Sequence, residues 1–446
     1  MTNPPIEIFK WLLLPVLAVL INPVNGADGE HQWRADQVQT GFTDSPAAPL
    51  AEHPTLADYL TTAAHNNPAV KSAWARWQAE VNSIAVARGL PNPTASLGYF
   101  LENIETAVGP QELKISLNQM LPWFGKLRLA GQLQTRTAEI AAEQVNTAVY
   151  QLKYRVTEIY LDYYFLQRSI TLTQQNIALV RNWEKVVTSK YATARAGHPD
   201  LINTQIELLK LEDNLKTLEA QQSPLIEKFR LALNDKNLTE IIVPDSLDAI
   251  GRLLSQEEIV AIILESNPEF RIAELSRQAS ADNIKKARLN YYPDLGVGLD
   301  YIVTGEKLMS GTSGSGKDPL VVMVSASLPL WFKKNRSAVS AARYQYRATE
   351  ERYIDLENRL RAEAEQAWFE LEDARRKIAL YGDGLIPKSL ESLRATEKAY
   401  VADKLDFLNL VDAQRRYLQF LLEHERSLVA GQKAVARLEL LAGRDL

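Results

Sequence analysis

Apolar and polar residues alternate along four short stretches of the chain, which is the pattern of a β-strand with one apolar and one hydrated face. In the stretch "ELKISLNQML", Leu113, Ile115 and Leu117 fall on one face, and the residues between them are polar. Strands of about ten residues are long enough to cross a membrane at a tilt. We predict strands at about 94–103, 112–121, 294–304 and 320–330.

Each half of the chain also carries the pattern of two long helices. Between Ala138 and Ile170, apolar residues recur at spacings of three and four, with one extra spacing of four, which indicates a coiled-coil seam that contains a stutter. At about 1.5 Å per residue, the longest helix is roughly 100 Å long, and no compact domain requires such a length. We expect helices at about 126–193, 200–235, 334–402 and 406–442.

The two sets of elements indicate an internal tandem repeat. When the chain is shifted by 200 positions, 67–98 aligns with 267–298, and ten of the 32 residue pairs are identical, against roughly two expected from average composition. Each copy therefore spans about 200 residues. The predicted domains are a signal peptide at 1–26, an N-terminal extended segment at 27–54, a first repeat at 55–235, an equatorial linker at 236–254 and a second repeat at 255–446.

The N-terminus has the layout of a secretory signal. Lys10 precedes the apolar run "WLLLPVLAVLI", and the small residues of "VNGA" follow it, which predicts cleavage near Gly26. An uncleaved anchor is the alternative, although a run of eleven residues is too short to span a bilayer as a helix. No later stretch approaches the length of an apolar membrane-spanning helix. An exported protein of this kind is therefore expected in the periplasm, outside the cell, or in the outer membrane as a barrel.

Composition excludes several classes of function. The net charge of −5 argues against a nucleic-acid partner, which requires a basic surface. The chain has no cysteine, so it forms no disulfide, uses no thiol chemistry and carries no lipid on an N-terminal cysteine. Its five histidines are scattered without any pair at ligand spacing, and we expect neither a bound metal nor a cofactor. No nucleophile elbow is present, so we do not expect an enzyme.

Residues 311–319 read "GTSGSGKDP" and contain most of a phosphate-binding loop. Such a loop must connect a strand to a helix, whereas this stretch connects two predicted strands. Asp318 also stands where the magnesium-binding serine or threonine should be, and it adds negative charge where phosphate would lie. We therefore interpret the stretch as a solvated hairpin loop.

Four amphipathic strands do not close a barrel, because single-chain membrane barrels begin at about eight strands and open edges are costly in lipid. Two copies would give eight strands with a filled interior, and three would give twelve strands around a pore. The predicted fold class is a mixed α/β membrane protein with a trimeric 12-stranded β-barrel. Aromatic residues at the junctions of strands and long helices suit an interfacial girdle, with capping of a local core as the alternative. They are Trp123, Phe124, Trp331 and Phe332.

Both copies resemble the TolC family of outer-membrane efflux proteins. The resemblance covers 55–443 and rests on the Asn-Pro helix starts, on "PNP" and "YYPDLGVGLDY" before strands, on "LPWFGK" and "SLPLWFKKNRSAVSAA" after them, and on "DFLNLVDAQR". It implies a homotrimer whose barrel continues into an α-helical coiled-coil periplasmic tunnel. It also implies a Gram-negative outer-membrane location with a large periplasmic portion, surrounding membrane lipids, a periplasmic membrane-fusion adaptor and an inner-membrane RND pump.

The strings "PNP" and "SLPLWFKKNRSA" resemble the branch of the family that serves heavy-metal RND pumps. This resemblance implies a passive exit duct for heavy-metal cations, with selectivity in the pump. General drug efflux and type I protein secretion use the same architecture and stay open as alternatives. A purely structural periplasmic coiled coil is disfavoured, because it would not need four amphipathic strands.

The resemblance also implies a docking tip for the adaptor. The turns that join the long helices break the heptad pattern at about 194–200 and 403–408, roughly 100 Å from the strands by helix rise. The expected docking residues are Ala194, Arg195, Gly197, Asp403 and Lys404.

A periplasmic gate is implied next to this tip. In the family, tyrosine, arginine and aspartate contacts hold the tip shut, and by motif position Asp200, Tyr400 and Asp412 match the aspartates and the tyrosine. Two positions depart from the family pattern, since Asn409 stands where a second aspartate is usual and Leu405 where the arginine is. One aspartate per copy would still form charge rings in a trimer. The alternative for Asp200 is a favourable position at the start of a helix.

Overall fold

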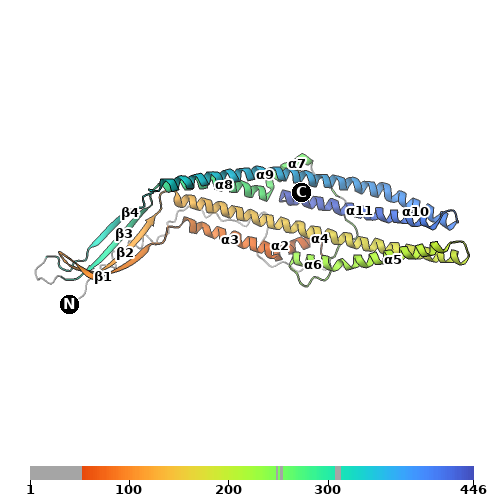
Figure 1. Ribbon diagram of the computed structural model, residues 1–446, viewed down its shortest axis with the longest axis horizontal. Helices are drawn as coiled ribbons and strands as arrows, with labels where there is room; N and C mark the ends of the chain where they lie inside the picture. The colour runs from red at the N-terminus through yellow and green to blue at the C-terminus, as the bar shows by residue number, and fades with distance from the viewer. Residues whose placement is uncertain (1–52, 248–249, 252–254, 307–312) are drawn as a thin grey trace. The chain divides into compact units, whose positions relative to one another are not determined.

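The computed structural model describes residues 53–247, 250–251, 255–306 and 313–446, all within one unit of the chain, Val38–Leu446. The predicted signal peptide lies outside the described residues, as does nearly all of the extended segment predicted at 27–54. Figure 1 shows a four-stranded sheet at one end of this unit and the turns between the long helices at the other. No described helix is both long and apolar enough to cross a membrane.

The two halves contain the same order of elements. The first half forms α2 (Leu56–Asn66), α3 (Pro68–Arg88), β1 (Thr94–Thr106), β2 (Gly109–Leu121), α4 (Lys126–Ala192), α5 (His198–Ala220) and α6 (Gln222–Leu233). The second half forms α7 (Gln256–Ser266), α8 (Pro268–Arg288), the 3₁₀ turn η2 (Leu289–Tyr291), β3 (Leu295–Thr304), β4 (Leu320–Ala326), α9 (Phe332–Ala379), the π-helical turn η3 (Leu380–Leu385), α10 (Ile386–Val401) and α11 (Phe407–Ala442).

Three elements are shorter than predicted or divided, each near a proline, whereas β1 and β2 are each three residues longer than predicted. The strand predicted to residue 330 ends at Ala326, because Pro329 has no N–H to donate to the ladder. The helix predicted at 200–235 is divided at Gln221, three residues before Pro224. The helix predicted at 334–402 is interrupted by η3, which precedes Pro387. A proline inside a helix removes one backbone hydrogen bond and disturbs the preceding turn.

Within each half of the chain, an asparagine at the start of one helix contacts the end of another helix, and the two contacts are alike. Asn67 begins α3, and its side-chain amide donates to the carbonyl of Ala232 at the end of α6 (2.9 Å). Asn267 begins α8, and its amide donates to the carbonyl of Leu441 at the end of α11 (2.7 Å). Both asparagines are buried. Each Asn-Pro pair therefore starts one helix and satisfies the open carboxyl end of another.

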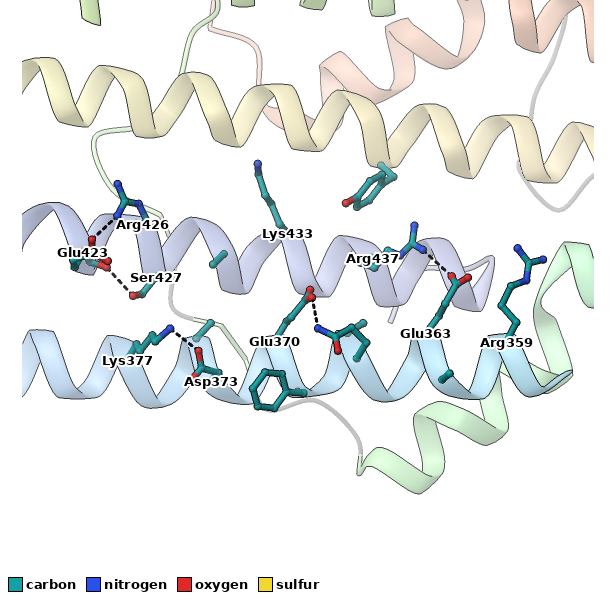
Figure 2. A pocket seen from close by; sticks show the side chains of 17 residues that line it. Arg359, Glu363, Glu370, Asp373, Lys377, Glu423, Arg426, Ser427, Lys433 and Arg437 are labelled. Atoms are coloured by element: carbon teal, nitrogen blue, oxygen red, sulfur yellow. Dashed lines mark hydrogen bonds and ion pairs between the residues drawn. The ribbon is translucent and has the colours of Figure 1, made fainter. Parts of the chain in front are cut away.

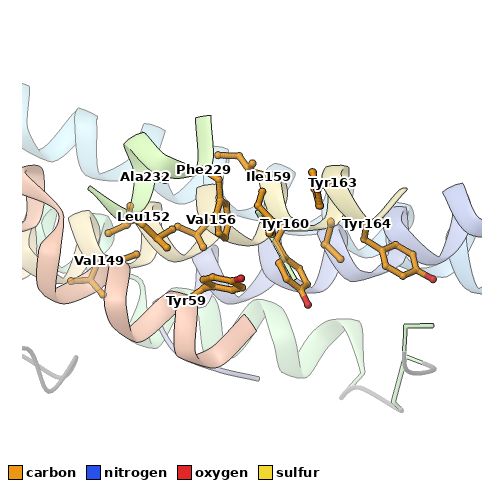
Figure 3. Packing of buried hydrophobic residues seen from close by; sticks show 14 of the residues in the cluster. Tyr59, Val149, Leu152, Val156, Ile159, Tyr160, Tyr163, Tyr164, Phe229 and Ala232 are labelled. Carbon is orange, nitrogen blue, oxygen red and sulfur yellow. The ribbon is translucent and has the colours of Figure 1, made fainter. Parts of the chain in front are cut away.

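The helical core is aromatic on the side of α4 that faces α2 and α6 (Figure 3). The rings of Tyr59 and Phe229 meet edge to face, with centroids 5.0 Å apart, and Tyr160 of α4 lies 6.1 Å from Tyr59. The hydroxyl of Tyr59 accepts a hydrogen bond from the backbone N–H of Ile242 (3.1 Å). This cluster holds the predicted equatorial linker against the long helix, although the described parts of that linker, 236–247 and 250–251, contain neither helix nor strand.

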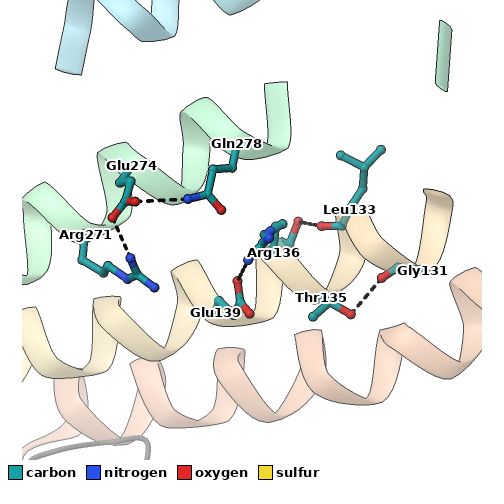
Figure 4. A network of polar contacts seen from close by, with 9 residues as sticks. Gly131, Leu133, Thr135, Arg136, Glu139, Arg271, Glu274 and Gln278 are labelled. Atoms are coloured by element: carbon teal, nitrogen blue, oxygen red, sulfur yellow. Dashed lines mark hydrogen bonds and ion pairs between the residues drawn. The ribbon is translucent and has the colours of Figure 1, made fainter. Parts of the chain in front are cut away.

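Charged side chains between α4 and α8 form ion pairs within their own helices (Figure 4). Arg136 pairs with Glu139 on α4 at 2.8 Å, and Arg271 pairs with Glu274 on α8 at 2.6 Å. Pairs of this kind are worth only a few tenths of a kcal/mol each. The polar contacts there satisfy the helix surfaces, and the apolar clusters hold the helices together.

Candidate functional site

On its two central strands the sheet buries polar side chains on one face, and on its two edge strands the apolar side chains of the other face are exposed. On one face, Ser116 of β2 lies opposite Asp300 of β3, and these residues are only 6% and 2% exposed. On the other face, Leu97, Val322 and Val324 are 71%, 73% and 77% exposed. A sheet in a water-soluble protein has the reverse arrangement. The apolar face of this sheet is therefore suited to lipid and the opposite face to water.

The polar face contains an ion pair between the two halves of the chain. Lys114 of β2 lies 2.6 Å from a carboxylate oxygen of Asp300 on β3. The polar side chains there are crowded, since a Cβ at Gly298 would lie 2.3 Å from the side-chain oxygen of Asn118. Glycine at that position lets neighbouring polar groups fit on one face.

The hairpin loop between β3 and β4 is tied to β3 where it is described. Asp318 accepts hydrogen bonds from the hydroxyl of Tyr301 and from the backbone N–H of Thr304, the latter at 2.8 Å. The described residues 313–319 are turn and coil between two strands, as the sequence predicts, whereas a phosphate-binding loop must lead into a helix.

The four predicted girdle residues lie at the two junctions between a strand and a long helix. Phe124, Trp331 and Phe332 are 82%, 76% and 64% exposed. Trp123 is half-buried, because its ring stacks on Tyr292 with centroids 5.3 Å apart and planes inclined by 14°. The junction after β4 is therefore more exposed than the junction after β2.

The predicted docking residues occupy two turns with the same backbone geometry. Ala194 and Asp403 both have left-handed backbones, with φ of 56° and 59°. The N–H of Arg195 donates back to α4, and that of Lys404 donates back to α10, at 2.8 and 2.9 Å. Gly197 is the N-cap of α5. All five residues are exposed, so their side chains and the turn backbones are open to a partner.

Lys190 joins the two turns. Its ammonium group donates to the carbonyl oxygen of Tyr400 at 2.5 Å and to the carboxylate of Asp403 at 2.6 Å. The same group lies 4.4 Å from the centre of the Tyr400 ring. The lysine of α4 thus satisfies the carboxyl end of α10, where cations are favoured by the helix dipole. Its hydrogen bond lowers the pKa of Asp403 below the usual range.

Two of the three predicted gate residues, Asp200 and Tyr400, lie close enough for the charge of the aspartate to act on the tyrosine. Tyr400 is buried at the end of α10, where its ring packs edge to face on Phe407 with centroids 5.6 Å apart. Burial raises the pKa of Tyr400 to about 12, and the negative charges of Asp200 and Asp403 add to the rise. Within the described chain, the Tyr400 hydroxyl has no hydrogen-bond partner. An unpaired buried hydroxyl is costly, so this packing does not fully satisfy the tyrosine.

Asp412 is separate from this pair and belongs to a second contact. It is exposed on α11, one turn before Arg415, and its charge is among those that raise the pKa of that guanidinium. Arg415 donates through two nitrogens to Glu207 of α5, whose carboxylate is buried. This bidentate pair links α5 to α11 and is the largest cause of the raised pKa of Arg415.

Sequence reasoning missed both Lys190 and the Arg415–Glu207 pair. A lysine in the last turn of a helix is ordinarily expected to act on its own carboxyl end, and nothing in the sequence shows that it reaches another helix. Glu207 did leave a signal, since it occurs between Thr204 and Leu211 at spacings of three and four, on the buried face of α5. A charged residue on such a face indicates a buried ion pair.

A groove of about 760 Å³ lies between α9 and α11, with Tyr154 of α4 among its lining residues (Figure 2). Acidic side chains of α9 (Glu363, Glu370 and Asp373) line it opposite basic side chains of α11 (Arg426, Lys433 and Arg437). Arg437 pairs with Glu363 across it at 2.7 Å. No group of three or more potential metal ligands occurs anywhere in the described parts of the chain. The groove therefore offers a charged helix surface and no metal centre.

The chain is similar to outer-membrane efflux proteins in sequence. Residues 259–444 match the family model described as outer membrane efflux protein. The outer membrane efflux protein BepC of Brucella suis biovar 1 is 21% identical over 375 residues, which cover 80% of this chain and 78% of BepC.

Solved structures of outer-membrane channels share the fold. OprN superposes with a TM-score of 0.75 and 17% identity over 92% of this chain and 96% of OprN. CusC superposes with a TM-score of 0.73 and 14% identity over 91% of this chain and 96% of CusC. The fold agrees along nine tenths of the chain, and the sequence match covers most of the second half. In sequence, 259–444 match the outer membrane efflux protein family, and in fold the chain is similar to solved outer-membrane channels.

Proposed function

We propose that this protein is the outer-membrane channel of a tripartite efflux system, a passive exit duct for substrates delivered by an inner-membrane RND pump through a periplasmic adaptor. The observation that carries the proposal is the inverted burial of the sheet, with Asp300 at 2% and Val324 at 77% exposure. Such a sheet is stable when lipid covers its apolar face and water fills the space beside its polar face. Proteins of this family are channels and not enzymes.

Closure of the barrel requires further copies of the chain. The sheet has the order β1-β2-β3-β4, so β1 and β4 are its edges. Because unpaired strand edges are prohibitively costly in lipid, we infer that β4 of one copy pairs with β1 of the next. Three copies would form a 12-stranded barrel that leaves a pore, and the tandem repeats at 55–235 and 255–446 would continue it as a helical tunnel in the periplasm.

The exposed turns of the tip are the proposed adaptor-docking surface. Arg195 and Lys404 lie at equivalent positions of the two turns and carry the same charge. The 67-residue helix α4 separates these turns from the sheet by about 100 Å at the rise of an α-helix. Such a distance allows the docking surface to stand deep in the periplasm while the sheet is in the outer membrane.

The gate is proposed to close by contacts between the two helix pairs at the tip. Lys190 holds the end of α10 through Tyr400 and Asp403, and Arg415 holds α11 to α5 through Glu207. Asp200 and Asp412 would then form acidic rings when the chain is repeated around a three-fold axis. Acidic rings in a narrow pore favour cations.

Asp412 provides a test of the gate. Planar-bilayer recordings of Asp412→Ala should show a weaker preference for cations or a looser closed state than the unmodified channel. Asp213→Ala removes an exposed aspartate from α5 and serves as the matched control. If the Asp412 variant kept both the selectivity and the gating of the unmodified protein, Asp412 would have no part in the gate.

Heavy-metal cations are the proposed cargo, on the basis of the strings "PNP" and "SLPLWFKKNRSA". Loss of the protein should then sensitise the cell to transition metals. Unchanged metal tolerance with new sensitivity to dyes and detergents would instead favour general drug efflux. Retention of an exported protein inside the cell would favour type I secretion.

The channel itself is tested by reconstitution and cross-linking. The purified protein should conduct ions in planar bilayers, and cross-linking in native membranes should trap trimers. Monomers alone in the membrane, or bilayers without conductance, would contradict the proposed function.

A further inference from the structure

The junction between β4 and α9 carries positive charge that the described chain does not neutralise. Lys333, Lys334 and Arg336 follow the exposed aromatic pair Trp331 and Phe332, and all five side chains are exposed. In the described part of the protein, none of these three cations has a carboxylate partner. The junction also contains a recess of about 670 Å³, lined by Leu330, Trp331, Phe332, Lys333, Lys334 and Ser337.

The corresponding junction in the first half is neutralised. Lys126, which follows Trp123 there, forms an ion pair with Asp294 at 2.7 Å. The same carboxylate oxygen accepts a hydrogen bond from the backbone N–H of Trp123 at 2.8 Å. Asp294 immediately precedes β3, the strand that pairs with β2. The first junction therefore uses a carboxylate from the neighbouring strand to balance its lysine.

The duplicated sequence lacks this carboxylate at the second junction. In the repeat alignment Lys334 corresponds to Lys126, and Thr94 at the start of β1 corresponds to Asp294. If β4 pairs with β1 of a second copy, as the proposed trimer requires, Lys334 meets a threonine where Lys126 meets an aspartate. Each contact between copies then keeps its cations without a counter-ion from the residues that the structure describes.

The helix that starts at this junction increases the demand for negative charge. α9 begins at Phe332, and no side chain caps its first turn. The free N–H groups of a first turn carry partial positive charge, which disfavours lysine at that end of a helix. Lys333 and Lys334 both lie in that turn. An anion beside them would relieve the mutual repulsion and accept hydrogen bonds from the free N–H groups of that turn.

We propose that the β4–α9 junction binds the negatively charged headgroup of a membrane phospholipid, with Trp331 and Phe332 contacting the adjoining acyl region. The inference rests on the proposed membrane location. The exposed aromatic side chains beside the cations favour a lipid over free phosphate, because aromatic residues occupy the boundary between headgroups and acyl chains. Lipid selectivity here follows from charge, with phosphatidylglycerol bound more tightly than phosphatidylcholine.

The test measures the lipid retained by the purified full-length protein in native mass spectrometry after titration with phosphatidylglycerol. Each cation near an anionic lipid surface changes affinity by roughly fivefold, so the double variant Lys333→Gln/Lys334→Gln should bind this lipid about 25-fold more weakly. Lys333→Arg/Lys334→Arg should retain binding. Lys210→Gln/Lys216→Gln makes the same change of charge on exposed positions of α5 and should have no effect.

Three results would overturn the proposal: equal retention of phosphatidylglycerol by the glutamine variant, equal binding of phosphatidylcholine by the unmodified protein, or displacement of the lipid by millimolar inorganic phosphate. If the double variant assembles poorly, the single variant Lys333→Gln should still show about a fivefold loss. Bilayer conductance on the same samples separates this proposal from the proposed channel function. Weaker lipid binding by the glutamine variant with unchanged conductance supports the lipid site. Absence of conductance in the unmodified protein contradicts the channel function, and the lipid-binding measurement then tests the lipid site by itself.

Discussion

The second half of the chain contacts α4 at two levels, and the contacts differ in kind. Near the middle of the long helices, Glu425 of α11 is buried and accepts hydrogen bonds from the Tyr164 hydroxyl and from Arg168, both at 2.9 Å. At the tip, Lys190 contacts Asp403, whose side chain is 48% exposed. Breaking a buried ion pair costs several kcal/mol, whereas an exposed pair contributes at most about 1 kcal/mol. The Glu425 contact at the middle should therefore be harder to break than the Lys190–Asp403 contact at the tip, whose lysine is 13% exposed and whose carboxylate is half exposed.

The backbone differs between the same two levels. α4 runs without interruption through both, whereas η3 separates α9 from α10 between them. η3 contains Gly382 and Gly384, and a Cβ at Gly382 would lie 3.2 Å from the ring of His424 on α11. Glycine and a following proline both weaken a helix. A tip that moves would therefore bend the second long helix at η3 and leave α4 straight.

Loss of the buried contact between Glu425 and Arg168 should have the largest effect on the free energy of unfolding. Glu425→Ala leaves Arg168 and the hydroxyl of Tyr164 without their acceptor, and we expect the free energy of unfolding to fall by about 3 kcal/mol. Denaturant unfolding in detergent measures the loss. Glu423→Ala is the control, because it removes a half-buried i,i+3 partner of the exposed Arg426 and should cost less than about 0.5 kcal/mol. Equal losses in the two variants would show that the middle contact is no stronger than a surface pair.

The tip contact should affect gating more than stability. Lys190→Met removes both hydrogen bonds to the end of α10, and we expect about 1 kcal/mol of destabilisation. Planar bilayers should show a larger open fraction than in the unmodified channel, since the end of α10 is no longer held. Lys190→Arg keeps the charge and should restore part of the closure.

Arg181→Met is the matched control for Lys190. Arg181 lies on the same helix and pairs with Glu212 of α5 at 2.8 Å, so its loss does not free α10. An open fraction unchanged in the Lys190 variant, or raised equally in the Arg181 variant, would contradict the role of Lys190 as the contact that holds the tip.

Local sequence patterns predicted the helices and strands, but they did not predict the contacts between residues far apart in the sequence. Alternating residues such as Leu113 and Ile115 locate β2, because the side chains of a strand alternate between its faces. The break at η3 was missed, since the apolar pattern continues across Gly382 and Pro387 gives only a local signal. The partners of Lys190 lie more than 200 residues away, at 210 and 213 positions. Such contacts depend on how the helices pack, which periodicity alone does not specify.

Substitutions in the docking turns should have the smallest effect on stability, but they should abolish adaptor binding. Arg195 and Lys404 are exposed, and neither has an ion pair in the described chain. Arg195→Glu/Lys404→Glu should therefore change the free energy of unfolding by less than about 0.5 kcal/mol, as for other surface substitutions. The same variant should lose capture of the adaptor in a pull-down, because two positive charges per copy become negative where the partner docks. Lys210→Glu/Lys216→Glu makes the same reversal on α5, away from the turns, and should capture the adaptor normally. Intact capture and efflux in the Arg195/Lys404 variant would mean that the adaptor contacts another surface, and that the loosely held tip serves the gate alone.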